Sequence, residues 1–271
     1  MPELPEVQTV VNNLKNKLIG KTILSIESPN GYHKVFHKLS LKEINNYTIN
    51  KNILKINRIG KYITIELNKG FICIHLRMTG KLLYNTENDK KHISAKFSFK
   101  KSNYLIFDDV RKFGRIYYTE NLKWLHNKIG IDPLSKEFTL EWLHKRMSKR
   151  KRMIKSLLFD QSFIAGLGNI YIDESLWKSK IHPNTIVSKL SISDLKKLHN
   201  AIINILKKAI KFQGTTIINF YFDENSKGNY GEQLYVYGRN NFNCLRCNQI
   251  ITKIIVCQRG THICDNCQKI K

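Results

Sequence analysis

The sequence lacks any apolar run approaching the roughly 20 residues that a membrane-spanning helix needs, so we expect no membrane association. It also lacks the apolar core of a secretory signal peptide, which favours a cytoplasmic location, and it contains no internal repeat. Acidic residues are scarce: 21 Asp and Glu stand against 46 Lys and Arg, giving a formal net charge of +25. Such an imbalance favours a polyanionic partner, above all nucleic acid.

Cysteine is sparse except at the carboxyl end, where four of the six cysteines cluster. Disulfides are not expected in a basic chain without a signal peptide. The two Cys-x2-Cys pairs instead fit a four-thiolate site for one structural zinc ion. Its expected ligands are Cys244, Cys247, Cys264 and Cys267.

The residues between the two cysteine pairs predict a hairpin. An apolar run over 250–256, a turn at 258–260 and a second run over 261–263 place Arg259 at the tip. So short a segment buries too little apolar surface to fold alone, and the metal should stabilise it. Cys257 is expected within a strand and Cys73 in the core. A zinc ribbon used only as a structural clip is the alternative.

Periodicity divides the rest of the chain into regions of different secondary structure. Apolar residues from Leu4 to Leu18 recur at helical spacing and stop before Gly20. Alternating runs predict strands at 22–28, 53–58, 61–67, 71–78, 95–99, 104–108 and 115–118, which favours a sandwich. Helices are predicted at 139–149, 153–160 and 170–178, and from a Ser193 cap to 212, before a mobile polar loop at 214–231.

These regions predict an α+β multidomain fold. An N-terminal helix and a β-sandwich form a first domain over residues 1–130. A helical domain with a helix–two-turns–helix arrangement follows over 131–230, and the zinc-ribbon hairpin occupies 231–271. DNA is expected to lie between the strand-rich and helical domains.

The first residues carry a set of groups suited to covalent catalysis. If Met1 is removed, Pro2 becomes a terminal secondary amine, and α-amino groups titrate near roughly pKa 8. A sizeable neutral fraction at pH 7 allows imine formation with a sugar aldehyde carbon. Glu3 and Glu6 lie on one side of the helix start. The alternative is structural, since proline is common at helix starts.

Two further motifs suit DNA. Gly166-Leu167-Gly168-Asn169 precedes a helix, and a helix amino terminus binds phosphate well, although a plain turn between helices is the alternative. Met78, Arg111 and Phe113 stand at predicted strand ends. There they could enter a duplex and fill the space that an extruded nucleotide leaves, or they could pack in the core.

These motifs together resemble the bacterial formamidopyrimidine-DNA glycosylase family. The matching segments run in order along the whole chain: residues 2–7, 60–62, 75–80, 91–92, 111–114, 166–171 and 236–239, and the cysteine ribbon with 258–261. The resemblance implies a bifunctional glycosylase and AP lyase of base excision repair. Such an enzyme removes oxidised purines through a Schiff base at the terminal proline and then cleaves by β,δ-elimination. It would act as a monomer on damaged duplex DNA.

The resemblance also implies a role for each matching residue. Pro2 is the nucleophile, Glu3 the acid at the sugar ring oxygen, and Glu6 the residue that orders the site. Lys61 assists elimination, and Arg259 completes the catalytic set. Met78, Arg111 and Phe113 would fill the void. The implied backbone contacts are Asn169, Arg259, His75, Lys253 and Tyr237, with His92 and Lys151 as further DNA contacts.

One departure affects the expected substrate. The family usually has glycine where Gln213 stands and a basic residue where Ile218 stands, in a loop that covers the lesion base in relatives. The endonuclease VIII-like enzymes, which act on oxidised pyrimidines, are therefore an alternative. A non-catalytic protein that binds damaged DNA, or a zinc-ribbon protein of translation or transcription, would explain the charge and the cysteines but not the amino-terminal groups.

Overall fold

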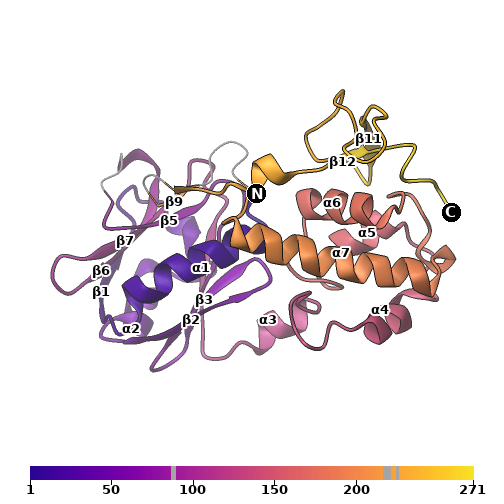
Figure 1. The fold of residues 1–271 in the computed structure, drawn as a ribbon. Helices are drawn as coiled ribbons and strands as arrows, with labels where there is room; N and C mark the ends of the chain where they lie inside the picture. The colour runs from indigo at the N-terminus through magenta and orange to yellow at the C-terminus, as the bar shows by residue number, and fades with distance from the viewer. Residues whose placement is uncertain (87–89, 216–220, 224–225) are drawn as a thin grey trace. The chain divides into compact units, whose positions relative to one another are not determined.

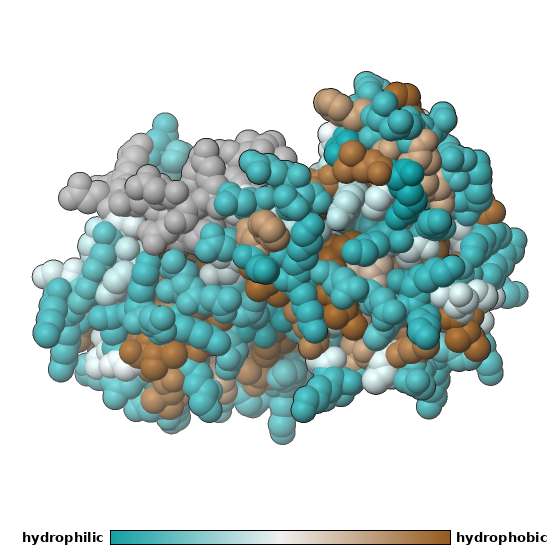
Figure 2. All heavy atoms as spheres, viewed as in Figure 1, coloured by the Kyte–Doolittle hydropathy of each residue, from teal (hydrophilic) through white to brown (hydrophobic). Residues whose placement is uncertain are grey.

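The structure is a computed structural model that describes residues 1–86, 90–215, 221–223 and 226–271 (Figure 1). It divides into two compact units. Unit 1 comprises residues 1–127 and 212–229, and unit 2 comprises residues 128–211 and 230–271. No helix in these ranges is both long enough and apolar enough to cross a bilayer. On the face drawn in Figure 2, hydrophilic residues predominate, as the charge imbalance predicts.

Unit 1 is a β-sandwich of two antiparallel four-stranded sheets. One sheet has the order β1-β6-β7-β5 and the other β2-β3-β4-β8. The strands are β1 (Ile23–Glu27), β2 (Ile53–Ile59), β3 (Tyr62–Leu67), β4 (Phe71–His75), β5 (Lys81–Tyr84), β6 (Ile93–Phe99), β7 (Tyr104–Asp108) and β8 (Arg115–Thr119). The sandwich prediction is confirmed.

Helices and short elements complete unit 1. They are α1 (Leu4–Leu18), α2 (Leu41–Thr48), the 3-10 turns at His33–Val35 and Lys90–His92, and the short strands β9 (Tyr221–Asp223) and β10 (Ser226–Lys227). The apolar face of α1 packs into the same core as both sheets. Burying that face stabilises α1 against the sandwich and fixes the position of the amino terminus.

Unit 2 is helical, with a β-hairpin near its carboxyl end. Its helices are α4 (Leu140–Met147), α5 (Ile154–Phe159), α6 (Asn169–Ser179) and α7 (Ile192–Lys211), with 3-10 turns at Val187–Lys189 and Tyr230–Gln233. Helix α3 (Lys123–Lys128) lies at the boundary between the units. The hairpin consists of β11 (Thr252–Val256) and β12 (Arg259–Ile263), and β12 packs against α6.

Local chemistry explains where the helices of unit 2 begin. The Thr139 hydroxyl accepts a hydrogen bond from the Trp142 amide, as predicted for the start of α4. The predicted cap of α7 is wrong. Ser191, not Ser193, exchanges hydrogen bonds with Asp194, with the Asp194 amide donating to Ser191 Oγ and the Ser191 amide to the Asp194 carboxylate.

The hairpin turn also differs from its prediction. Val256 pairs with Arg259, so the two-residue turn is Cys257-Gln258, at φ +52° and +59°. Two positive φ angles are typical of the hairpin turns whose twist matches that of the strands. Arg259 therefore begins β12, and Cys257 is an exposed turn residue, whereas Cys73 is buried in the core as predicted.

Candidate functional site

The carboxylates at the start of α1 form a reciprocal cap. The Glu3 amide donates a hydrogen bond to Glu6 Oε2 at 2.8 Å, and the Glu3 side chain accepts from the Glu6 backbone. Both side chains are buried, at 3% and 2% exposure, and Pro2 beside them is buried as well. A cap orders the first turn of the helix. Pro2, the predicted nucleophile, and the carboxylates of Glu3 and Glu6 therefore lie together in one ordered site that is largely shielded from solvent.

A segment distant in the sequence binds the second oxygen of Glu6. The Thr215 amide donates to Glu6 Oε1 at 2.8 Å. Gly214 reaches this position with φ +81°, and a Cβ atom there would lie 2.8 Å from the same oxygen. Only glycine fits both the left-handed backbone and the close approach. Sequence reasoning missed this contact, and Ile218 and its neighbours over 216–220 lie outside the described residues.

Lys61 occupies the turn between β2 and β3 and is buried. The turn is held to α1, since Arg58 Nε donates to Gln8 Oε1 at 2.9 Å and an Arg58 guanidinium nitrogen donates to the Gly60 carbonyl. Burial lowers the pKa of Lys61 below its ordinary value, while the charges of Glu3 and Glu6 act to raise it. The structure therefore places Lys61 in the electrostatic field of the Glu3 and Glu6 carboxylates.

Met78, Arg111 and Phe113 form an exposed cluster. An Arg111 guanidinium nitrogen lies 3.3 Å from Met78 Sδ, and the guanidinium carbon lies 4.8 Å from the centre of the Phe113 ring. Met78 is 45% exposed and Phe113 47% exposed, so the core-packing alternative is wrong. Three side chains from two loops meet at one point on the surface.

A buried carboxylate, missed from the sequence, joins these two loops. Asp109 accepts hydrogen bonds from the Thr79 hydroxyl and from the Gly114 amide, the latter at 2.7 Å. The Arg111 amide in turn donates to Thr79 Oγ1 at 3.1 Å. Charge-assisted hydrogen bonds of this kind are stronger than neutral ones. They hold the two loops, and with them the exposed cluster, in one arrangement.

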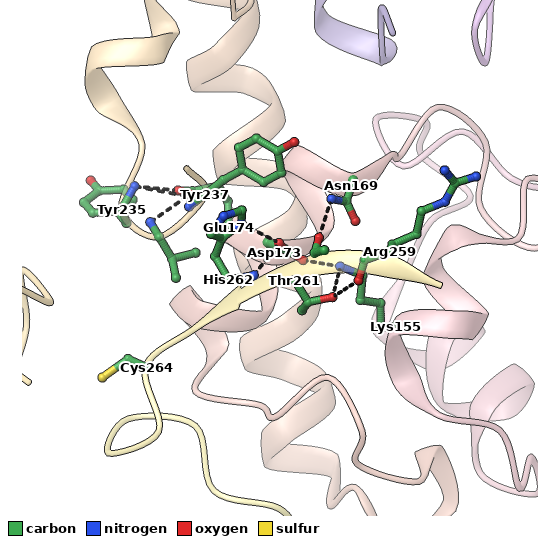
Figure 3. A network of polar contacts seen from close by, with 12 residues as sticks. Lys155, Asn169, Asp173, Glu174, Tyr235, Tyr237, Arg259, Thr261, His262 and Cys264 are labelled. Carbon is green, nitrogen blue, oxygen red and sulfur yellow. Dashed lines mark hydrogen bonds and ion pairs between the residues drawn. The ribbon is translucent and has the colours of Figure 1, made fainter. Parts of the chain in front are cut away.

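In unit 2, Asn169 at the start of α6 contacts the hairpin next to Arg259 in the sequence (Figure 3). Asn169 Nδ2 donates to the Gly260 carbonyl at 2.8 Å, and its buried Oδ1 has no hydrogen-bond partner in the described structure. The Arg259 guanidinium lies over the Phe159 ring at 5.4 Å. The Lys253 side chain passes close to Gly260, where an added Cβ would lie 2.9 Å from Lys253 Cε. Three predicted DNA contacts therefore gather around Gly260.

A fully buried ion pair fastens β12 to the helices. Lys155 Nζ lies 2.6 Å from Asp173 Oδ1 and donates to Thr261 Oγ1 at 2.8 Å. The other oxygen, Asp173 Oδ2, accepts from the His262 amide at 2.9 Å. The side chains of Lys155 and Asp173 are 1% and 0% exposed. The ion pair thus links α5, α6 and the hairpin. Its contact in the hairpin, Thr261, lies two residues after Arg259 in the sequence.

The next residue along α6, Glu174, fixes a second segment. Its carboxylate accepts hydrogen bonds from the amides of Tyr235, Val236 and Tyr237, at 2.8–3.1 Å. Burial raises the pKa of Glu174 above its ordinary value, while these three amides act to lower it. The contacts position Tyr237, whose ring also packs edge-on against His262 at 4.9 Å. The sequence signal that could have revealed this network is the pair of adjacent acids, Asp173 and Glu174, among the apolar residues of α6.

The remaining predicted DNA contacts lie in several places. His75 ends β4, is buried, and accepts a hydrogen bond from the Arg77 amide at Nδ1. His92 is half-buried just before β6, and Lys151 is exposed between α4 and α5. Their roles stay predictions.

The four predicted metal ligands converge. All four Sγ atoms lie within 4.8 Å of one another, at the base of the hairpin. Cys244 and Cys264 are buried together with Trp177 and Ile251. Within the described ranges this is the one group of three or more His, Cys, Asp or Glu side chains close enough to hold a metal ion.

Comparison with known proteins identifies similar chains over the full length. A family profile described as the formamidopyrimidine-DNA glycosylase N-terminal domain matches residues 1–116, and one described as the formamidopyrimidine-DNA glycosylase H2TH domain matches residues 129–221. The formamidopyrimidine-DNA glycosylase of Protochlamydia amoebophila is 39% identical over 99% of this chain and 100% of its own. That of Pelotomaculum thermopropionicum is 40% identical over 100% of both chains.

Solved structures of protein–DNA complexes have the same fold. A Lactococcus lactis FPG variant in complex with Fapy-dG-containing DNA superimposes with a TM-score of 0.91 and is 36% identical, covering 99% of this chain and 100% of that one. MutM in complex with DNA containing carbocyclic 8-oxo-G gives a TM-score of 0.90, also at 36% identity, covering 99% of this chain and 100% of that one.

Proposed function

Because the chain belongs to the formamidopyrimidine-DNA glycosylase family, we propose that it excises 8-oxoguanine and formamidopyrimidines from duplex DNA and then cleaves the abasic strand. It acts as a monomeric base-excision-repair glycosylase and AP lyase. One observation carries the proposal above all: the buried cluster of Glu3, Glu6 and Lys61 beside Pro2.

The chemistry begins at Pro2. Once Met1 is removed, the Pro2 nitrogen attacks C1′ of the extruded nucleotide, and the bond from C1′ to the base breaks as the new C–N bond forms. The base leaves with the electron pair of the broken bond and takes up a proton, while the amine loses one. Glu3 protonates the sugar ring oxygen, which opens the ring and leaves an iminium ion. Loss of a C2′ proton then expels the 3′ phosphate, and a second elimination expels the 5′ phosphate. Water finally releases the sugar fragment and the Pro2 amine.

The surrounding groups act by position and charge. Glu6, held by the Glu3 and Thr215 amides, keeps the helix start and the 214–215 segment in register. Lys61 binds a phosphate next to the reacting sugar and stabilises the negative charge that develops during elimination. Its buried setting removes competing water, which strengthens this interaction.

The other predicted residues bind DNA. Asn169, Arg259, Tyr237, Lys253 and His75 contact phosphates around the flipped nucleotide, and His92 and Lys151 contact the backbone further away. Cations and helix amino termini suit phosphate oxygens.

A second set fills the space that the nucleotide leaves. Met78, Arg111 and Phe113 enter the duplex, with Arg111 facing the orphan cytosine. Extrusion costs a few kcal/mol of unstacking, and the inserted side chains and phosphate contacts offset that cost.

The metal is zinc, bound by Cys244, Cys247, Cys264 and Cys267. With Zn–S bonds of about 2.3 Å, a tetrahedral site requires sulfur atoms about 3.8 Å apart. The Cys247–Cys264 and Cys244–Cys267 sulfur distances are 3.5 and 4.0 Å. Zinc here supplies no chemistry to the reaction. It stabilises the hairpin that carries Arg259.

Three functional domains follow from these roles: a catalytic domain over 1–130, a helix–two-turns–helix domain over 131–230 and the zinc ribbon over 231–271. The residues proposed to contact DNA come from all three domains. The protein acts in the bacterial cytoplasm on chromosomal DNA.

Borohydride trapping tests the function directly. Protein with a free Pro2 amine, verified by mass spectrometry, should form a covalent adduct with duplex containing 8-oxoguanine opposite cytosine. Pro2→Gly should lose most cleavage but much less binding. Cleavage of the lesion duplex without any trapped adduct would refute the imine mechanism. A panel of oxidised purines and pyrimidines tests the substrate class, and faster excision of pyrimidines would favour the endonuclease VIII-like alternative.

A further inference from the structure

A pocket of about 360 Å³ lies in unit 2, among residues to which the repair reaction assigns no role. Its lining comes from three segments: the loop before α4, α4 with the residues just after it, and the turn between α5 and α6. The lining residues are Ile129, Gly130, Ile131, Trp142, Arg146, Arg150, Ser162 and Phe163. This volume is at the lower end of the range for ligand sites and suits one large side chain.

The walls of the pocket are held by backbone hydrogen bonds. The Gly130 amide donates to the Gln161 carbonyl at 2.8 Å, and the Ala165 amide donates to the Ile131 carbonyl at 2.9 Å. A Cβ atom on Gly130 would lie 2.2 Å from the Phe163 carbonyl oxygen, so only glycine permits this approach. The pocket is therefore a built feature and not a gap between mobile side chains.

Two arginines lie over the aromatic rings of the pocket. The Arg150 guanidinium lies 5.1 Å from the centre of the Phe163 ring, and the Arg146 guanidinium 5.9 Å from that of Trp142. The two rings are 5.3 Å apart. Arg150 is further oriented because its Nε donates to the Arg146 carbonyl at 2.9 Å.

Neither arginine has a carboxylate within ion-pair distance in the described parts of the chain. More cations are adjacent to them in the sequence. Lys145, Lys149 and Lys151 are exposed nearby, and only Arg152 of this run is paired, with Asp160. An acidic ligand would therefore meet two oriented guanidinium groups and a wider positive field.

We propose that this pocket binds a short acidic peptide segment of a partner protein. An apolar side chain enters beside Trp142 and Phe163, while carboxylates pair with Arg146 and Arg150. The concave shape favours a peptide over duplex DNA, whose phosphates lie on a convex surface. A guanidinium group already lies over one face of each ring, which leaves less room for a stacked nucleobase.

Fluorescence anisotropy with a labelled acidic hexapeptide ending in phenylalanine tests the proposal. The full-length protein should bind it, and replacing the terminal phenylalanine by alanine should weaken binding at least fivefold. The double variant Arg146→Glu/Arg150→Glu should weaken binding at least tenfold. The matched control Lys145→Glu/Lys149→Glu makes the same charge change outside the pocket and should weaken binding less than threefold.

Three outcomes would overturn the inference. Equal losses in the two double variants would mean that only general charge attracts the peptide. No effect of the terminal phenylalanine would mean that the pocket is not entered. Displacement of the peptide by a single-stranded oligonucleotide, with the same dependence on Arg146 and Arg150, would make the pocket a nucleic-acid contact. The conservative pair Arg146→Lys/Arg150→Lys, which keeps the charge but not the planar donors, should fall between wild type and charge reversal. Thermal melting verifies that each variant is folded.

Discussion

The contact between Gly214 and Glu6 predicts a specific effect of one added methyl group. Gly214→Ala places a Cβ 2.8 Å from Glu6 Oε1 on a backbone with φ +81°. The left-handed conformation alone costs an alanine about 1–2 kcal/mol. Displacing Glu6 also weakens its hydrogen bond from the Thr215 amide, and bonds to charged groups contribute about 1.5–3 kcal/mol. We therefore expect a total destabilisation of about 2.5–5 kcal/mol.

The same displacement should reduce catalysis, because Glu6 also caps the helix start that carries Pro2. If as little as about 1.4 kcal/mol of the lost interaction is expressed in the transition state, the rate falls about tenfold. Single-turnover excision of 8-oxoguanine measures the rate, and urea unfolding measures the stability.

Gly20 provides a matched control. It has nearly the same backbone angle, φ +83°, but a Cβ there meets nothing within 4 Å. Gly20→Ala should lose only the conformational part, about 1–2 kcal/mol, and keep its excision rate. If Gly214→Ala and Gly20→Ala excise the lesion at the same rate, the 214–215 segment does not position Glu6 for catalysis.

Three other predictions concern Lys61, the buried ion pair and the metal. Burial lowers the pKa of Lys61, so its cation, present below that pKa, is lost as pH rises. The alkaline limb of kcat/KM for strand cleavage should therefore lie below the ~10.4 of free lysine, and Lys61→Arg should move it upward. Lys155→Met leaves Asp173 buried without its partner and should lower the free energy of unfolding in urea by about 3–5 kcal/mol. The control Arg152→Met breaks an exposed pair with Asp160 and should lower it by less than about 1 kcal/mol. Equal losses of stability in the two variants would contradict the burial of the Lys155–Asp173 pair. Chelating the metal should unfold the hairpin and weaken DNA binding, while the melting temperature of the sandwich in unit 1 stays unchanged. Circular dichroism measures the unfolding and the melting, and fluorescence anisotropy measures DNA binding.

Periodicity predicted most of the strands and helices because each buries one apolar face. It missed α2, whose exposed polar residues conceal a short apolar side, and the short elements α3 and β5. The segment predicted as a loop over 214–231 contains the short strands β9 and β10, which were missed as well. The hairpin turn was predicted at 258–260 but lies at Cys257-Gln258, so it begins one residue earlier and ends two residues earlier than predicted, because either position satisfies the apolar pattern of the hairpin. Such errors concern element ends, where propensity distinguishes neighbouring residues weakly.

The site was predictable in its chemical groups but not in its supports. The cysteines are recognisable from their spacing alone, whereas the roles predicted for Pro2 and Glu3 rest on the resemblance to a family, because proline at a helix start is also common for structural reasons. The partners of Glu6 and Asp173 are far away in the sequence, at Thr215 and His262, and no local pattern announces them. Gln213 illustrates the same limit: it adopts φ +62°, in the left-handed region that favours glycine, and no local pattern predicted this conformation.

Helix α6 carries three side chains that each hold a different segment of the proposed phosphate-binding surface: Asn169 at Gly260, Asp173 at His262 and Glu174 at Tyr237. Because all three residues belong to one helix, its backbone sets the spacing between these three contacts. If these residues bind phosphates as proposed, a surface with fixed spacing favours DNA that deforms to fit it, so we expect sequence steps and lesions that bend easily to be bound more tightly.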